Sequence, residues 1–243
     1  MTRSHCPFQY EVEEKLGGMT ALGGLPLFME FARRMGLPQL IAHHVRVRMG
    51  NQGWSEEQMI MAVMVLNLAG GDCVDDVRIL EGDEGFCRVF RAIEDYGWTG
   101  SERRALKRSR RKPRTRTFPS PTALREFLEL FHDPEQEKQR QPHKAFIPEP
   151  SDLLLGLVLL NASFAAEVQR RSPRTPATLD MDATLVETWV NRRMKAVRFW
   201  LINLPGRIHK RGRRFFVRLA RGHPSNEILF EARRRMLCLC DSG

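Results

Sequence analysis

Two carboxylates at alternate positions form the pattern in this sequence that could carry chemistry. Asp180 and Asp182 lie in a run, Thr178 to Val186, in which apolar and polar residues alternate. Such alternation is typical of a β-strand and places Asp180, Asp182 and Thr184 on one face. Carboxylates two residues apart on a strand are about 7 Å apart and could line a site for a hard divalent cation. The alternative, acids on the solvent face of an edge strand, fits the pattern equally well.

A dense basic segment precedes this run. Nine of the fourteen residues from 103 to 116 are Arg or Lys, and Pro113 interrupts them. Like charges at this density repel one another and cannot form a core, so the pattern predicts a linker over residues 101–120. DNA phosphates would neutralise the segment, whereas the alternative is a solvated tether with no specific partner. The nine cations are Arg103, Arg104, Lys107, Arg108, Arg110, Arg111, Lys112, Arg114 and Arg116.

The end of the chain is also strongly basic. Residues 190–243 carry 14 Lys and Arg against 3 Asp and Glu, a net charge of +11, whereas residues 1–100 carry 9 against 14, a net charge of −5. An acidic head joined to a basic tail favours an anionic partner, and nucleic acid is the commonest such partner. The alternative is two amphipathic helices packed on a core. The cations that we single out as further DNA contacts are Arg207, Arg211, Arg213 and Arg214.

Helical periodicity must position these groups. Ser55 opens a capping box before a nearly all-apolar helix, Met59 to Leu68, which we expect at the centre of a core. The spacing predicts further helices over residues 27–35, 75–80, 85–92 and 121–133, and a loop over 134–150. A long helix over 151–171 should bury Leu154, Leu155, Val158, Leu159 and Ala162. In the basic tail, Phe215, Phe216 and Leu219 predict a helix, and Ser225 the cap of a final one.

Composition excludes several classes of protein. The five cysteines are odd in number and none has CxxC spacing, so a disulfide framework or a zinc site is not expected. The longest apolar run, Leu153 to Ala166, is too short to span a bilayer, and residues 1–10 lack the apolar core of a signal peptide. We therefore expect a cytoplasmic protein that is not bound to a membrane.

Longer strings resemble a known family, the bacterial insertion-sequence transposases of the DDE class. The stretches Pro-Ser-Pro-Thr-Ala-Leu-Arg-Glu-Phe (119–127) and Ala-Thr-Leu-Asp-Met-Asp-Ala-Thr-Leu-Val-Glu-Thr (177–188) resemble the N-terminal half of these proteins. The stretches Ile-Asn-Leu-Pro-Gly-Arg (202–207) and Gly-His-Pro-Ser-Asn-Glu (222–227) resemble their extreme C-terminus. The resemblance implies an internal deletion whose two blocks meet near residues 189–190.

This resemblance implies a fold and a site. The family's catalytic core is an RNase H-like sheet that binds Mg²⁺, and Asp182, followed by Ala183 and Thr184, matches its first catalytic aspartate. Asp180 is the second possible metal ligand, and the family's other Asp and its Glu fall in the missing region. The expected fold is mainly α. It has a helical domain (1–100), the basic linker, a truncated RNase H-like remnant with one strand at 177–187 (121–189), and a basic helical segment (190–243).

The expected function follows from the deletion. Strand transfer needs two metal ions held by three carboxylates, so the chain should bind DNA and fail to cut it. Its expected partners are DNA, at the nucleoid, and transposase subunits. Two alternatives remain, a DNA-binding regulator that competes with full-length transposase, and a non-functional gene remnant.

Overall fold

A computed structural model describes residues 8–13, 20–47, 53–96, 101, 104, 115–141, 149–171, 198–212 and 214–241. Most described residues are helical, which confirms the expected mainly α class. The helices and turns of the first part are α1 (Leu25–Arg34), α2 (Leu37–His44), α3 (Glu56–Ala69), η1 (Val74–Asp76), α4 (Val77–Gly82) and α5 (Glu84–Glu94). They are followed by α7 (Pro121–Glu129), α8 (Pro134–Glu137), α9 (Asp152–Arg171), the short π-helical turn η2 (Arg198–Ile202) and α11 (Ser225–Asp241).

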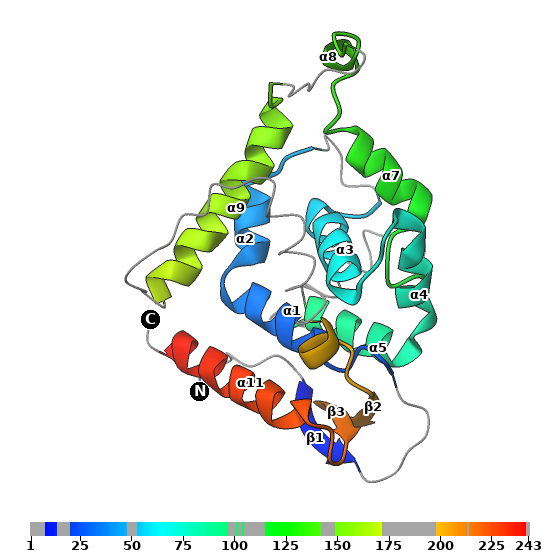
Figure 1. Cartoon of the computed structure of the whole chain (residues 1–243), viewed down its shortest axis with the longest axis vertical. Coiled ribbons are helices and arrows are strands. Elements are labelled where there is room, and N and C mark those ends of the chain that lie inside the picture. Colours follow the sequence, from blue (N-terminus) through cyan, green and yellow to red (C-terminus); the bar gives the residue numbers. More distant parts are fainter. Residues whose placement is uncertain are drawn as a thin grey trace.

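Helix α3 lies at the centre, as its sequence predicts. The Ser55 hydroxyl accepts a hydrogen bond from the Gln58 amide, and the Gln58 side chain accepts one from the Ser55 amide. This capping box satisfies two amides that the first helical turn leaves free. Met59 and Ala62 are fully buried, and the helix ends at Gly70 in the left-handed conformation. In Figure 1, α1, α2, α4 and α5 lie around α3, and α8 lies at the far end of the long axis.

The basic tail forms strands where the sequence analysis expected a helix. Residues Gly206–Arg211 (β2) and Arg214–Ala220 (β3) form an antiparallel hairpin, and β1 (Phe8–Glu13) pairs in parallel with β3, which gives the order β1-β3-β2. The expected helix through Phe215 and Leu219 is therefore wrong. Val217 and Leu219 are fully buried, so the burial period on this strand is two.

The final helix is present, but its expected cap is not. Helix α11 begins at Ser225, whose buried hydroxyl oxygen has no hydrogen-bond partner in the described part of the chain. Instead, the Ser225 amide donates to Nδ1 of His223, and the Asn226 side chain donates to the carbonyl of Ala220. His223 on the turn after β3 and Asn226 in the first turn of α11 thus fix the start of this helix.

The hydrophobic core joins the head of the chain to its tail. Ile202, Leu204 and Leu229 belong to the same buried cluster as the residues of α1 to α5. Backbone hydrogen bonds also connect the two parts, from the Gly23 amide to the Leu204 carbonyl and from the Gly206 amide to the Thr20 carbonyl. In Figure 1 the sheet and α11 accordingly lie directly below α1 and α5.

The end of the predicted linker is part of this core. Thr117 and Phe118 are fully buried, and Phe118 packs against the rings of Phe86 and Phe90. The Glu81 carboxylate accepts hydrogen bonds from the amides of Thr117 and Phe118 at 2.8 to 3.0 Å. The chain is thus anchored to α4 where it leaves the basic segment.

Helix α9 lies along α2 at one flank of the molecule (Figure 1), with a different face inward from the one expected. Gly156 and Leu160 are buried, whereas Leu154, Leu155, Val158 and Leu159 are exposed. The inward face is built for close approach: a Cβ atom at Gly156 would overlap the His44 carbonyl, and the Ser163 hydroxyl is 3.0 Å from His44 Nε2. The small Gly156 and the polar Ser163 therefore contact α2, with the buried Leu160 on the same inward side of α9.

The structure bears differently on the expected loop, the expected helix over 121–133, the membrane span and the expected strand. The predicted loop over 134–150 contains α8, whose first turn is capped by the Asp133 carboxylate, and the helix predicted over 121–133 ends at Glu129. By length and composition alone, α9 is the one helix in the described part of the chain that could cross a membrane. It is longer than the apolar run seen in the sequence, so length does not exclude that role. The predicted strand at 177–187 lies outside the described residues.

Candidate nucleic-acid interface

The β2–β3 hairpin gathers basic side chains that the sequence analysis linked to DNA. Between Gly206 and Arg221 there are seven Lys and Arg residues and no Asp or Glu. One face of the hairpin, with Ile208, Val217 and Leu219, contacts the core. The antiparallel register places three pairs of side chains opposite one another on the other face: Arg207 with Arg218, His209 with Phe216, and Arg211 with Arg214.

The end of the hairpin beside the turn is its most exposed part, and there Lys210 lies on one face of the ribbon and Arg211 and Arg214 on the other. Gly212, at φ +63°, makes the turn, and Lys210, Arg211 and Arg214 are exposed beside it. The Lys210 ammonium lies 5.5 Å from the centre of the Phe215 ring, a cation–π contact that holds the charge at this end. We call Lys210, Arg211 and Arg214 the hairpin tip. Within the described ranges none of these three has an ion-pair partner.

Charge repulsion at the tip favours an anionic partner. Arg211 and Arg214 are directly opposite across the ladder, where like charges are destabilising. Arg207 and Arg218, nearer the core, are half-buried and already interact within the chain, so the tip offers the accessible charge. A polyanion bound at the tip would relieve the repulsion that the bare tip bears.

Other basic residues of the tail have structural partners. Arg198 donates from Nη2 to the Asn67 carbonyl at 2.6 Å, near the end of α3. Arg233 pairs with Glu30 at 3.1 Å, and Arg234 and Arg235 both pair with Glu231. These pairs hold the pKa of the Glu231 carboxyl at about 2, below its usual value, because both guanidinium groups donate hydrogen bonds to it. The described basic residues of the tail thus divide between structural contacts and the hairpin.

Several predicted site residues lie outside the described residues, and their placement stays a prediction. Of the nine linker cations, Arg104 is exposed, and Arg116 donates from Nε to the Phe118 carbonyl at 3.4 Å. Arg207, Arg211 and Arg214 come together on the hairpin. The residues not described are Asp180, Asp182, Arg103, Lys107, Arg108, Arg110, Arg111, Lys112, Arg114 and Arg213.

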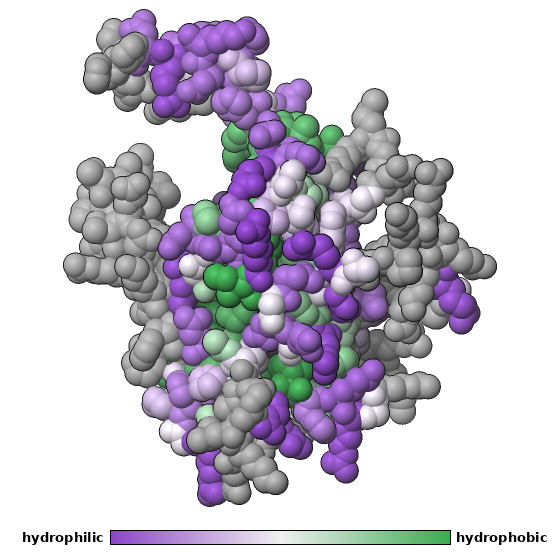
Figure 2. All heavy atoms as spheres, turned by 90° about the vertical axis from the view of Figure 1, so that its right-hand side faces the viewer, coloured by the Kyte–Doolittle hydropathy of each residue, from purple (hydrophilic) through white to green (hydrophobic). Residues whose placement is uncertain are grey.

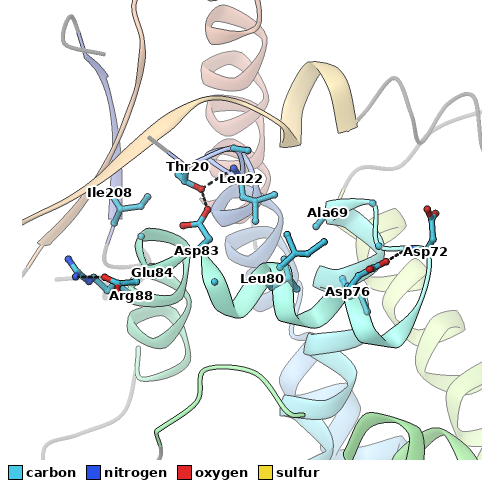
Figure 3. A pocket seen from close by; sticks show the side chains of 17 residues that line it. Thr20, Leu22, Ala69, Asp72, Asp76, Leu80, Asp83, Glu84, Arg88 and Ile208 are labelled. Carbon is cyan, nitrogen blue, oxygen red and sulfur yellow. Dashed lines mark hydrogen bonds and ion pairs between the residues drawn. The ribbon is translucent and has the colours of Figure 1, made fainter. Parts of the chain in front are cut away.

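A cavity of about 980 Å³ at the base of the hairpin is lined mainly by acidic charged groups, in contrast to the basic hairpin tip. Figure 3 shows Ile208 on one side of it, with Asp72, Asp76 and Asp83 along the others. Because the acids of this cavity would repel phosphate, the cavity is not part of the candidate interface.

Figure 2 shows the face of the molecule that carries α4, α5 and α7. This face is mostly hydrophilic, with hydrophobic areas near its middle.

Three of the four acids that line the cavity, Asp76, Asp83 and Glu84, are occupied by structural contacts. Asp76 accepts hydrogen bonds from the amides of Cys73 and Asp72, which lower the pKa of its carboxyl. Asp83 caps α5 through the Phe86 amide and accepts from the Thr20 hydroxyl, and Glu84 pairs with Arg88 at 3.1 Å. Among the described residues, no three His, Cys, Asp or Glu side chains form a group that could hold a metal ion.

Two parts of the interface were not predicted from the sequence: Lys210 as a DNA contact, and the β2–β3 hairpin itself. The sequence does contain a pattern for this hairpin. Phe215, Val217 and Leu219 stand at alternate positions, as on a strand with one buried face, and Gly212 between basic residues is typical of a tight turn. In comparisons with known proteins, no family model, no curated protein and no solved structure matches the chain.

Proposed function

We propose that this protein binds DNA through the hairpin tip, and that it is the DNA-binding remnant of an insertion-sequence transposase of the DDE class that has lost strand cleavage. One observation carries the first part. Lys210, Arg211 and Arg214 are exposed together at the end of a two-stranded β-ribbon, and no acidic partner lies beside them in the described part of the chain.

The shape of the hairpin suits a nucleic acid. The major groove of B-DNA admits a two-stranded β-ribbon, and arginine side chains can form paired hydrogen bonds with guanine edges or with phosphate. The buried Val217 and Leu219 on β3 attach the ribbon to the core and so hold the tip at the surface. The linker cations, from Arg103 to Arg116, would add phosphate contacts that carry no sequence preference.

The proposed family origin explains why binding would occur without cleavage. In this proposal Asp180 and Asp182 lie on the first strand of an RNase H-like remnant, and Asp182 is a Mg²⁺ ligand. A single aspartate cannot position two metal ions, and the partner carboxylates of the family belong to the segment missing between the two blocks.

The packing supports a folded product. Ile202, Leu204 and Leu229, from the C-terminal block, complete the core of α1 to α5, so the proposed deletion leaves this core closed. A stable DNA-binding chain could occupy the DNA ends used by an intact transposase, or associate with its subunits, and so act as a competing regulator. The nucleoid would be its place in the cell.

Salt-dependent DNA binding tests the proposal. We expect the affinity for duplex DNA, measured by fluorescence anisotropy, to fall steeply with salt because each neutralised phosphate contributes a log–log slope of about −0.9. Replacing Lys210, Arg211 and Arg214 with Ala should weaken binding and flatten the slope by about 2 to 3 if all three contact phosphates.

The matched control removes the same charge elsewhere. The triple variant Arg78→Ala, Lys138→Ala, Arg140→Ala also lowers the net charge by three, but each of these exposed cations pairs with a neighbouring acid. Its binding should stay close to that of the unmodified chain. Equal losses in the two triple variants would contradict a role for the hairpin tip and indicate attraction by overall charge only.

A further inference from the structure

The outward face of α9 carries an unusual amount of exposed apolar surface. Val158 is 57% exposed and Leu159 is 53% exposed, on a helix of 20 residues in which two are buried. The exposed positions follow a spacing of three and four residues, which forms one stripe along the helix. We call this stripe the α9 outer face. It consists of Leu155, Val158, Leu159, Ala162, Ala165 and Ala166, all exposed.

The two halves of the α9 outer face differ in size. The N-terminal half carries Leu155, Val158 and Leu159, and the C-terminal half carries the alanines. If a second copy of α9 lies antiparallel across this face, the large side chains of each helix meet the small ones of the other. A parallel pair would instead place leucine against leucine at one end and leave alanine against alanine at the other. Well-filled interfaces alternate large and small side chains across facing positions, so the antiparallel arrangement packs better.

The charges at the ends of the stripe fit the same arrangement. Asp152 is exposed in the first turn, and Arg170, 61% exposed in the last turn, pairs with Glu167 on its own helix. Asp152 and Arg170 are 18 residues apart, or about five turns, so they lie on the same edge of the stripe. In an antiparallel pair, edges of the same kind face each other across the two-fold axis.

The positions of Asp152 and Arg170 along the helix axis also fit an antiparallel pair. From a crossing point at Leu160, Asp152 is about 12 Å towards one end and Arg170 about 15 Å towards the other. Each aspartate would therefore lie within one helical turn of the arginine of the second copy, and the contact would occur twice because a two-fold interface is self-complementary.

We propose that the α9 outer face is a homodimer interface, in which two copies of this chain pair antiparallel through α9. The inference does not depend on DNA binding. It follows from the exposed apolar stripe, its division into large and small halves, and the opposite charges at its two ends.

Sedimentation velocity over a range of concentrations, without DNA, tests the proposal on the full chain. The mass should rise from 28.1 kDa towards twice that value. Val158→Glu should raise the dimer dissociation constant by about tenfold or more, because it buries a charge in the middle of the stripe. The control is Leu128→Glu, at an exposed leucine of α7, which should leave dimerisation unchanged. Thermal unfolding followed by circular dichroism would verify that both variants are folded.

A charge exchange tests the orientation. Asp152→Arg and Arg170→Asp should each weaken the dimer, because each places like charges together at both ends of the interface. The double variant should bind more tightly than either single variant, which a parallel pair would not produce.

Three results would overturn the proposal: a chain that stays monomeric at all concentrations, a dimer that Val158→Glu leaves intact, or an exchange variant without recovery. A monomer that instead binds lipid vesicles, with Val158→Glu removing the binding, would assign the stripe to a membrane surface. Because these measurements contain no DNA, their failure is distinct from failure of the DNA-binding proposal.

Discussion

The Glu30 carboxylate on α1 lies 3.1 Å from Nε of Arg233 on α11, and the carboxylate is completely buried. Its other oxygen is 3.6 Å from Nε of Arg34, whose side chain is 7% exposed and whose guanidinium nitrogens have no hydrogen-bond partner in the described ranges. A negative charge from the head of the chain thus neutralises two positive charges inside the protein, one of them from the tail.

Removing this charge should be costly. In Glu30→Gln, Arg34 would remain buried without a counter-charge, and breaking a buried pair in this way typically costs about 3 to 5 kcal/mol. Urea unfolding would measure the loss. Glu57→Gln is the matched control, because Glu57 pairs with Arg33 where both side chains are partly exposed, and it should change the unfolding free energy by less than about 1 kcal/mol. Equal stability of the two variants would show that the buried contact contributes nothing particular.

The close approach of Gly24 to the tail predicts a second sensitive position. A Cβ atom at Gly24 would overlap the Leu201 carbonyl, and backbone on both sides leaves little room for adjustment. Gly24→Ala should destabilise the protein by about 1 to 3 kcal/mol through overpacking. A Cβ atom at Gly82 would meet no other atom within 4 Å, so Gly82→Ala should be close to neutral in the same urea titration. Loss of stability in Gly82→Ala alone would contradict this packing.

The thiol of Cys87 should be protected until the protein unfolds. Burial raises the pKa of this thiol, and its Sγ donates to the Leu80 carbonyl at 3.3 Å. Because a raised pKa lowers the thiolate fraction at pH 7 to 8, the Cys87 thiol should react with iodoacetamide far more slowly than the exposed Cys73. Peptide mapping after timed labelling would compare the two. Rapid labelling of Cys87 in the folded protein would contradict its buried position on α5.

Absence of strand cleavage is the prediction that depends on the proposed deletion. We expect no nicking of DNA with Mg²⁺ or Mn²⁺, because the proposed deletion would remove the carboxylates that hold two metal ions together with Asp182. Supercoiled plasmid and duplexes of varied sequence serve as substrates, and an active nuclease serves as positive control. Specific nicking that disappears in Asp182→Ala would refute an inactive remnant.

The helical part of this fold could be predicted because its signals are local. The capping box at Ser55 and the apolar run after it define α3 without reference to any other part of the chain. The hairpin was missed because Phe215, Phe216 and Leu219 fit a helical face as well as a strand when they are considered alone. What separates the two is the buried period of two at Val217 and Leu219, which depends on the core beneath them.

The candidate site shows the same division. Sequence alone identified the cations Arg207, Arg211 and Arg214 and their charge, but their grouping depends on pairing between β2 and β3. The partner of Glu30 could not be found, because Arg233 is 203 residues away and carries no local signal. On α9 the apolar residues were recognised, yet their direction was wrong because the close approach of α2 needs Gly156 and Ser163 inside.

The backbone pairing of Thr20 with Gly206 has a consequence for how the protein forms in the cell. These two residues enclose a long loop, so the contact can form only after Gly206 has been synthesised. Until then Ile202, Leu204 and Leu229 cannot cover the apolar surfaces of α1 and α5, which stay exposed to solvent. Such distant contacts slow folding and leave the nascent chain open to aggregation on the ribosome. A translation product that stops before the hairpin would therefore lack the part of the core that closes it.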